Sequence, residues 1–253
     1  MQASRKAYFK KSLSIAWPAV LEFFFIAIAG IIDTFMVSSL GPASIAAIGL
    51  TTQPKFIALS VFFAINAAVS ALIARRQGEG DRDKANTTLT TALYLMVLFV
   101  IVVDLIMVPF ANQILKFAGS NAETHKLAYD YYMIIMLGIF FNSLSMLINS
   151  AHRGCGHTQI AFITNLVSSA VNIGLNFLLI EGRLGFPKLG VKGAAYATVA
   201  GTIVASIMCV ISLTNKNSYM NFKTMAKNRF RFSLEIAREI KNLAVNLFIE
   251  NVS

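Results

Sequence analysis

The sequence predicts an all-α integral membrane protein: a lobe of six transmembrane helices, followed by the start of a seventh helix. Three observations support this fold class. The 253-residue chain is 56% hydrophobic and only 13% charged, whereas soluble domains carry about 25% charged residues. Its mean hydropathy is +0.65. It also contains six apolar runs that reach the roughly 20 residues a helix needs to cross the hydrocarbon core.

The six predicted spans are the main apolar runs of the chain. They cover residues 14–38, 54–74, 87–111, 128–150, 160–180 and 193–213. The connections between them are short, so successive helices are expected to be antiparallel neighbours. Residues 1–213 are therefore expected to fold as one six-helix lobe.

The basic segment 214–241 is the longest connection and is predicted to link two units. Between residues 230 and 236 its apolar side chains alternate with charged or polar ones, and Ser233 is placed to open a helix. The pattern predicts either an amphipathic linker on the inner leaflet or a solvated basic loop.

The last residues, 242–253, have the composition expected of a second unit that is beginning. A basic lead-in is followed by an apolar run that contains Glu250, and the first span has the same order around Glu22. Transporters often contain such repeats. We therefore expect the chain to be the first half of a twelve-helix, two-lobe protein, whose partner is a second six-helix lobe.

The distribution of basic residues predicts the orientation in the membrane. Sixteen Lys and Arg residues fall on the side of the amino terminus and six on the other side. The positive-inside rule then places the amino terminus in the cytoplasm, in a multi-pass protein of the cell inner (cytoplasmic) membrane. Topology and anionic lipid headgroups explain the net charge of +10 better than nucleic acid does.

Two carboxylates lie inside the first span. Glu22 and Asp33 are 11 residues apart, which places them within roughly 20° of each other and about 16 Å apart along a helix. A charge in a span costs at least about 2.5–3.5 kcal/mol and usually faces a cavity or a partner. This face is suited to hold a proton, a metal ion or a cationic substrate. Alternatively, each acid is buried and neutralised by a partner.

Other polar side chains in the spans are candidate lining residues of a cavity. Asn165, Asn172 and Asn176 form one helical stripe in the fifth span. The candidates for contact with substrate are Glu22, Gln53, Asn66, Asn142, Asn149 and Glu250. Each amide could instead serve as a hydrogen-bonding contact between helices. Asp104, in the third span, is a further acid for which the sequence names no partner.

The sequence contains no enzyme constellation. It has no P-loop and no Gly-x-Ser-x-Gly motif. Cys155 and Cys209 are too few and too far apart for a disulfide framework. His152 and His157 flank a short glycine-rich turn and match no zinc spacing. A secondary transporter needs only embedded titratable or cation-binding groups and two alternating states, so that class is favoured over an enzyme, a channel or a purely structural membrane protein.

Several motifs, in this order along the chain, resemble the amino-terminal lobe of the multidrug and toxic compound extrusion (MATE) family. The first is Asp33-Thr-Phe-Met-Val, with Leu40-Gly41 and Ile45-Ala-Ala-Ile-Gly49 after it. The others are Ala74-Arg-Arg-Gln-Gly78-Glu-Gly80-Asp81, Arg153-Gly154, and Asn172-Ile-Gly-Leu-Asn176 with the later Gly185-Phe-Pro187-Lys-Leu-Gly190-Val-Lys-Gly193-Ala-Ala. The resemblance covers essentially the whole chain.

The resemblance implies two six-helix lobes that exchange an expelled organic cation or drug for inward Na⁺ or H⁺, with no other cofactor. Asp33 matches the family's first-helix acid, and Asn172 matches an asparagine of that same coupling-ion site. Asn176 departs from one branch of the family, which has an acid there, and Glu250 resembles a cation-site acid of the second lobe. The related lipid-linked oligosaccharide flippases are the alternative. A flippase would need a wide cationic cavity, and essentially no Lys or Arg is expected inside these spans.

Overall fold

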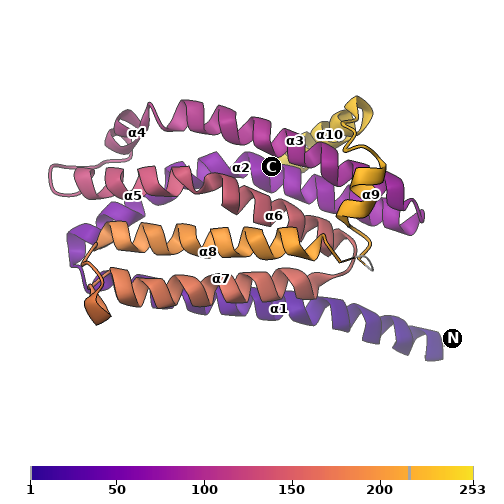
Figure 1. The fold of residues 1–253 in the computed structure, drawn as a ribbon, viewed down its shortest axis with the longest axis horizontal. Coiled ribbons are helices and arrows are strands. Elements are labelled where there is room, and N and C mark those ends of the chain that lie inside the picture. The colour runs from indigo at the N-terminus through magenta and orange to yellow at the C-terminus, as the bar shows by residue number, and fades with distance from the viewer. Residues whose placement is uncertain (1, 216–217, 253) are drawn as a thin grey trace.

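The chain forms a bundle of helices that lie roughly side by side along its long axis (Figure 1). The structure is a computed structural model that describes residues 2–215 and 218–252, with side chains described for residues 17, 20–22, 24–215 and 218–247. No strand occurs in these described residues. The elements are α1 (Gln2–Ser38), α2 (Pro42–Gly78), α3 (Arg82–Met107), α4 (Ala111–Phe117), α5 (His125–Leu137), α6 (Ile139–Gly154), α7 (Thr158–Leu179), the 3-10 turn η1 (Arg183–Gly185), α8 (Val191–Ser212), α9 (Phe222–Lys227) and α10 (Leu234–Val252).

The structure confirms the predicted all-α membrane fold class. Five helices are long and apolar enough to cross a membrane: α1, α2, α3, α7 and α8. The pair α5 and α6 passes the same test together but is bent by 49°, so it supplies a sixth span if it crosses as one broken helix. The break falls at Gly138, where a Cβ atom would lie 2.6 Å from Cγ2 of Val199 on α8.

Two predicted boundaries were wrong, and prolines explain both. The second span was expected to begin at residue 54, but α2 begins at Pro42, directly after Gly41 with its φ of 91°. Proline is favoured at the first position of a helix because the missing N–H would be unpaired there anyway. Pro54 lies inside α2, as membrane helices tolerate. The third span ends at Met107, just before Pro109, rather than at residue 111.

Helices α7 and α8 pack closely because α8 presents a stripe of small residues. Gly193, Ala197, Gly201 and Ala205 recur at four-residue spacing and are all buried. Small residues at this spacing let two membrane helices approach each other closely. A Cβ atom on Gly201 would lie 2.8 Å from the carbonyl oxygen of Ser168 on α7. This contact allows α7 and α8 to present their polar side chains to one another.

We expect Gly201→Ala to destabilise the bundle by about 1–3 kcal/mol, because the new methyl group meets backbone that cannot rotate away. Gly174→Ala on α7 is the matched control. A Cβ atom there has nothing within 4 Å, and alanine is favoured over glycine in a helix by about 0.5–1 kcal/mol. Thermal unfolding of the detergent-purified variants measures both effects. Equal midpoints for the two variants would contradict the close packing.

The segment after α8 folds back onto the start of α3. Arg82 donates to the carbonyl oxygens of Ser218 (2.5 Å) and Tyr219 (3.1 Å), and Met220 and Met225 are fully buried. Part of this segment is therefore packed against α3, whereas other parts of it, including residues 226–227 and 229–232, are exposed. Whether it lies on the inner leaflet remains a prediction.

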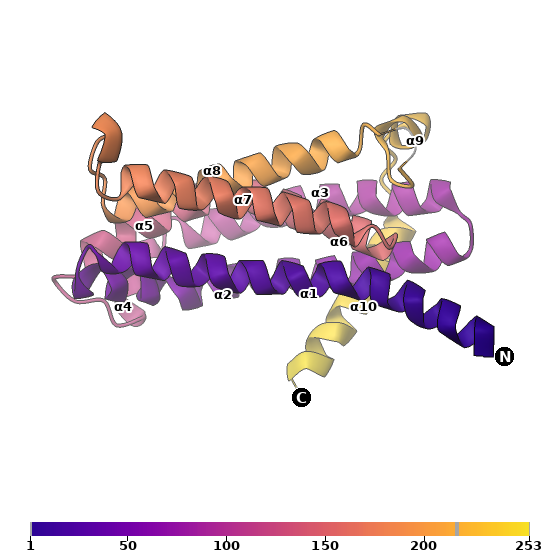
Figure 2. The same cartoon turned by 90° about the horizontal axis from the view of Figure 1, so that it is seen from below.

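Helix α10 begins at Leu234, after Ser233 as expected, and Ser233 Oγ accepts a hydrogen bond from the Ile236 N–H at 3.4 Å. It is continuous across residues 241 and 242, so no break marks the predicted boundary there. Arg76 at the end of α2 forms a 2.5 Å ion pair with Glu239 and fixes α10 against α2. Beyond this contact, α10 extends away from the bundle (Figure 2).

Candidate ion-coupling site

The two acids of α1 meet two asparagines of α7. The helices lie side by side and run in the same direction (Figures 1 and 2). Asn176 Nδ2 donates a hydrogen bond to Asp33 Oδ1, and Asn165 Nδ2 donates to Glu22 Oε1 at 2.6 Å. Both pairs span 143 residues of sequence. The two parallel helices therefore keep one alignment over eleven residues, or about 16 Å.

Asp33 belongs to a chain of polar groups from three helices, which we call the Asp33 network: Asp33, Asn172, Asn176 and Thr198. Asn176 is fully buried, and its Nδ2 lies 3.4 Å from Asn172 Oδ1. Asn172 Nδ2 donates in turn to Thr198 Oγ1 on α8, at 3.2 Å. The Oδ1 atom of Asn176 is buried without a hydrogen-bond partner among the described residues. The network thus gathers a carboxylate, two amides and a hydroxyl between helices.

A lysine lies close enough to Asp33 for their charges to attract each other. Lys55 is half-buried on α2 and lines a 170 Å³ cavity that Asn142, Thr198 and Thr202 also line. The cavity adjoins the Asp33 network because Thr198 belongs to both. The sequence interpretation counted Lys55 as a charge of an external connection. That was wrong: Lys55 lies well inside α2, and the Gly41-Pro42 helix start is the signal that would have placed it there.

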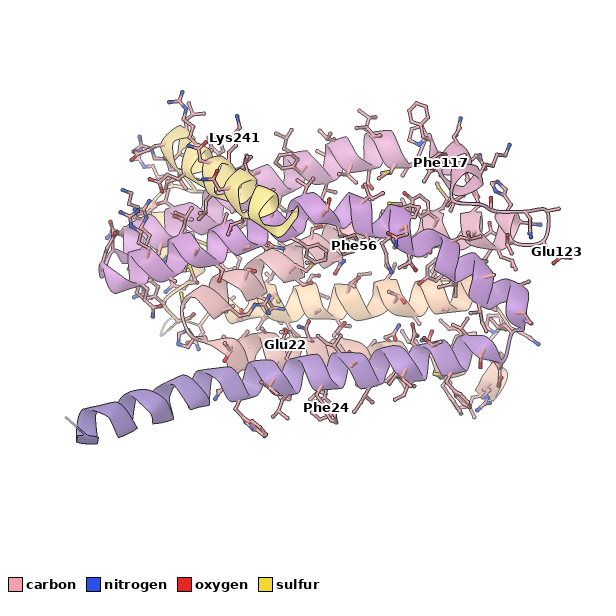
Figure 3. All side chains as sticks on the ribbon, turned by 180° about the vertical axis from the view of Figure 1, so that it is seen from behind. Glu22, Phe24, Phe56, Phe117, Glu123 and Lys241 are labelled. Atoms are coloured by element: carbon pink, nitrogen blue, oxygen red, sulfur yellow. The ribbon has the colours of Figure 1, made fainter. Side chains whose placement is uncertain are left out.

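Glu22 is held by two partners that the sequence did not name. Its side chain is 7% exposed and forms a 3.2 Å ion pair with Arg153, in the last turn of α6, besides the hydrogen bond from Asn165. Figure 3 shows Glu22 on the side of α1 that faces the other helices, whereas Phe24 points away from them. This arrangement matches the alternative of an acid neutralised by a partner. A role for Glu22 in contact with substrate stays a prediction.

The remaining predicted cavity residues are scattered through the bundle. Asn149 is buried and accepts hydrogen bonds from Thr164 Oγ1 (3.2 Å) and Cys209 Sγ (3.3 Å), so it joins three helices. Asn66 is buried, and its Nδ2 has no partner among the described side chains. Gln53 is exposed and lines a 460 Å³ cavity with residues of the 118–124 loop.

Three further positions lie apart from the Asp33 network. Asn142 reaches it only through the cavity beside Lys55. Asp104 on α3 has a buried Oδ1 without a hydrogen-bond partner in the described part of the chain. Glu250 lies in α10, but its side chain is outside the described residues. Sequence reasoning missed Thr198, because a single threonine in an apolar span carries no distinctive signal.

The groups that could bind an ion at Asp33 are one carboxylate, two side-chain amides and one hydroxyl. Among the described residues, no group of three or more His, Cys, Asp and Glu side chains is arranged to hold a metal ion. Hard cations prefer carboxylate, amide and hydroxyl oxygens. A proton on Asp33 would remove its charge altogether. The arrangement is therefore suited to a proton or a single hard cation.

Comparison with known proteins agrees with this architecture. The MatE family model matches residues 18–178. The chain is 27% identical over 206 residues to the probable multidrug resistance protein YoeA of Bacillus subtilis (strain 168), covering 81% of this chain and 44% of that protein. It is 31% identical over 173 residues to the FAD transporter of Shewanella oneidensis, covering 68% and 38%.

A solved structure supports the same conclusion. The structure of an outward-facing multidrug resistance MATE family transporter of the MOP superfamily superimposes with a TM-score of 0.86 at 25% identity, over 96% of this chain and 52% of that one. The chain thus spans about half the length of the proteins it matches. From the matched family model and the shared fold, this chain belongs to the MatE family.

Proposed function

We propose that this chain takes part in exporting cationic drugs or other xenobiotics across the cytoplasmic membrane in exchange for Na⁺ or H⁺. The observation that carries the proposal is the Asp33 network, in which a carboxylate accepts a hydrogen bond from a buried amide inside a membrane bundle. An ionisable group at this depth needs a functional reason. The name of the Bacillus subtilis relative, a probable multidrug resistance protein, supports drugs as the substrate class.

The proposed mechanism is competition for the charge of Asp33. When the cavity is open to the outside, Asp33 takes up a proton or Na⁺, and the oxygens of Asn172, Asn176 and Thr198 help to hold the ion. The unpaired Oδ1 of Asn176 is available for this contact. The neutralised site attracts a bound organic cation less strongly and releases it. This lobe then rocks against a second six-helix lobe, which we expect to complete the cavity.

Transport in proteoliposomes tests this function directly. The natural gene product is reconstituted into liposomes, and the movement of ethidium or norfloxacin is measured. A Na⁺ gradient or a pH gradient is imposed, each applied alone, so that the ion flows in the direction opposite to the drug. One of the two gradients is expected to drive the drug, and dissipating that gradient should stop its movement. Drug movement that responds to neither ion would overturn the coupling proposal.

Lys55 is expected to lower the affinity of the Asp33 site for Na⁺. Its ammonium attracts the carboxylate and repels an incoming Na⁺. Lys55→Gln should therefore raise the affinity of the site for Na⁺ by roughly tenfold, because even ~1.4 kcal/mol of lost repulsion has that effect. The readout is the Na⁺ concentration that half-protects Asp33 from labelling by a carbodiimide.

Lys192→Gln is the control for Lys55→Gln. It removes a lysine that is half exposed and paired with Asp130 at 3.1 Å. Its half-protecting Na⁺ concentration should equal the parental value. If Lys55→Gln also leaves that concentration unchanged, the lysine does not act on the ion site.

Lys55 also favours a second candidate, export of an anionic substrate. The Shewanella oneidensis relative is named a FAD transporter, and a lysine in an interior cavity would attract a phosphate-bearing molecule. Lipid-linked oligosaccharides carry the same chemistry, which keeps the flippase alternative open. The two candidates differ in one measurement. Loss of FAD export in Lys55→Gln with ethidium export intact would favour the anionic substrate, and the reverse pattern would favour the cationic drug.

The proposed orientation places the amino terminus in the cytoplasm. Arg75, Arg76, Arg82 and Arg153 gather at the same end of the bundle as the segment around α9, which supports the positive-inside assignment. Single cysteines introduced at Gly80 and Gly185 would lie at opposite ends. Labelling of intact cells with a membrane-impermeant maleimide should modify only the second. Labelling of the first alone would reverse the orientation.

A further inference from the structure

An apolar groove lies between α2, α3 and α10 and has no role in the proposed export. Its volume is about 550 Å³, within the range of about 300–1,000 Å³ that is typical of ligand pockets. The walls are built from large apolar side chains: Val61, Leu95, Phe99, Phe232, Leu234 and Val245. Several of them remain open to the surroundings, with Leu234 68% exposed and Val245 47% exposed. The groove is therefore an uncovered apolar surface on a membrane protein.

Two cationic side chains of α10 line the same groove. Arg238 and Lys241 are both exposed, and their three-residue spacing places them on one face of the helix. Neither forms an ion pair or a side-chain hydrogen bond with any residue that the structure describes. Glu239, which lies between them in the sequence, does have a partner. It forms a 2.5 Å ion pair with Arg76 and anchors the helix. Lys241 is labelled on α10 in Figure 3, at the edge of the bundle.

The groove is positioned so that its charged residues fall near the end of the bundle where basic residues gather. The N–H of Ser233, just before α10, donates to Thr91 Oγ1 on α3 at 3.2 Å. Phe232 packs edge-on against Tyr94 with ring centroids 6.1 Å apart, which fixes it at the rim of the groove. Aromatic and long basic side chains occupy this level at the boundary between headgroups and acyl chains.

We propose that this groove binds an anionic phospholipid, with an acyl chain along the apolar walls and the headgroup phosphate against Arg238 and Lys241. An acyl chain would cover the exposed apolar surface. Two cations without protein partners select a negatively charged headgroup over a zwitterionic one. The proposal is independent of the export function, because it uses no residue of the Asp33 network.

Native mass spectrometry of the detergent-purified natural gene product tests the site. Phosphatidylglycerol and phosphatidylcholine are added separately, and the retained lipid is measured. Phosphatidylglycerol should be retained more strongly. The double variant Arg238→Gln/Lys241→Gln should weaken its retention by roughly thirtyfold, from two charges near the membrane surface, and should leave phosphatidylcholine unchanged.

The matched control is Lys223→Gln/Arg229→Gln, which removes two positive charges from the same basic segment but away from this groove. Its retention of phosphatidylglycerol should equal the parental value. Equal weakening in both double variants would show a diffuse charge effect and overturn the site. Equal retention of the two lipids by the parental protein would also overturn it.

A photoreactive phosphatidylglycerol with a diazirine in its acyl chain tests the apolar walls. Label is expected on peptides of α2, α3 and α10 that line the groove. Ala237→Phe, which places a ring inside the groove, should reduce this label while the folded state, checked by thermal unfolding, is retained. Label confined to other helices would mean that another part of the protein covers the groove, and would overturn the proposal.

Discussion

Replacement of Asp33 by asparagine is expected to reduce the rate of drug export by on the order of 100-fold or more. This corresponds to an increase of ~2.7 kcal/mol or more in the activation free energy of transport. Asparagine has nearly the same shape and can still pair with Asn176 through hydrogen bonds. It cannot take up or release a proton, and it has no charge with which to hold Na⁺. The variant should insert into the membrane at the parental level, because it removes a charge from a span.

The measurement is ethidium efflux from cells that carry Asp33→Asn in the natural gene, normalised to the amount of protein in the membrane. Asp130→Asn on α5 is the control, because Asp130 pairs with Lys192 at 3.1 Å and lies outside the Asp33 network. That variant should export at nearly the parental rate. Parental export by Asp33→Asn, at equal membrane levels, would remove Asp33 from the mechanism and with it the coupling proposal.

The pairing between α1 and α7 follows from the sequence by simple geometry. Both are odd-numbered spans, so they run in the same direction. The acids of α1 and the outer asparagines of the stripe have equal eleven-residue spacing. Two parallel helices with equal spacing can join both pairs at once, and the structure does so. The stripe was therefore the informative signal, although no amide partner was named for Glu22 from the sequence.

The partners that α6 and α8 supply to Glu22 and Asn172 could not be predicted from the sequence in this way. Arg153 reaches Glu22 from the last turn of α6, and Thr198 reaches Asn172 from α8. Their positions depend on how the helices cross, which the bend at Gly138 and the small-residue stripe of α8 determine. Helical periodicity describes one helix at a time. Contacts between helices need the crossing geometry, and the sequence pattern does not contain it.

The start of the second span was misplaced, and this affected the interpretation of Lys55. The sequence prediction began the second span at residue 54. In the bundle, α2 continues through Pro54 and carries Lys55 with it. That single boundary decided whether the protein had a basic group in its interior. It therefore gives more weight to phosphate-bearing substrates, which the sequence prediction kept only as the flippase alternative.

Breaking the ion pair between Glu22 and Arg153 should be the largest single effect on stability. Glu22→Gln leaves the Arg153 charge between helices without its counter-ion. Removing one partner of a buried pair costs about 3–5 kcal/mol. Because the Arg153 side chain is 35% exposed, we expect about 2–3 kcal/mol, or a fall of roughly 5–10 °C in the unfolding midpoint. Asn165 can still donate to the glutamine, so the loss reports the charge rather than the hydrogen bond.

The double variant Glu22→Gln/Arg153→Gln separates the charge effect from simple loss of contact. With neither charge present, no uncompensated ion is left between the helices, so the double variant should be more stable than Glu22→Gln alone. Glu181→Gln is the control, because its pair with Arg183 is exposed on both sides and should contribute less than about 1 kcal/mol. If Glu22→Gln unfolds at the parental temperature, the pair does not hold α1 to α6. If the double variant is no more stable than the single one, the effect is lost packing and the buried charge has no special role.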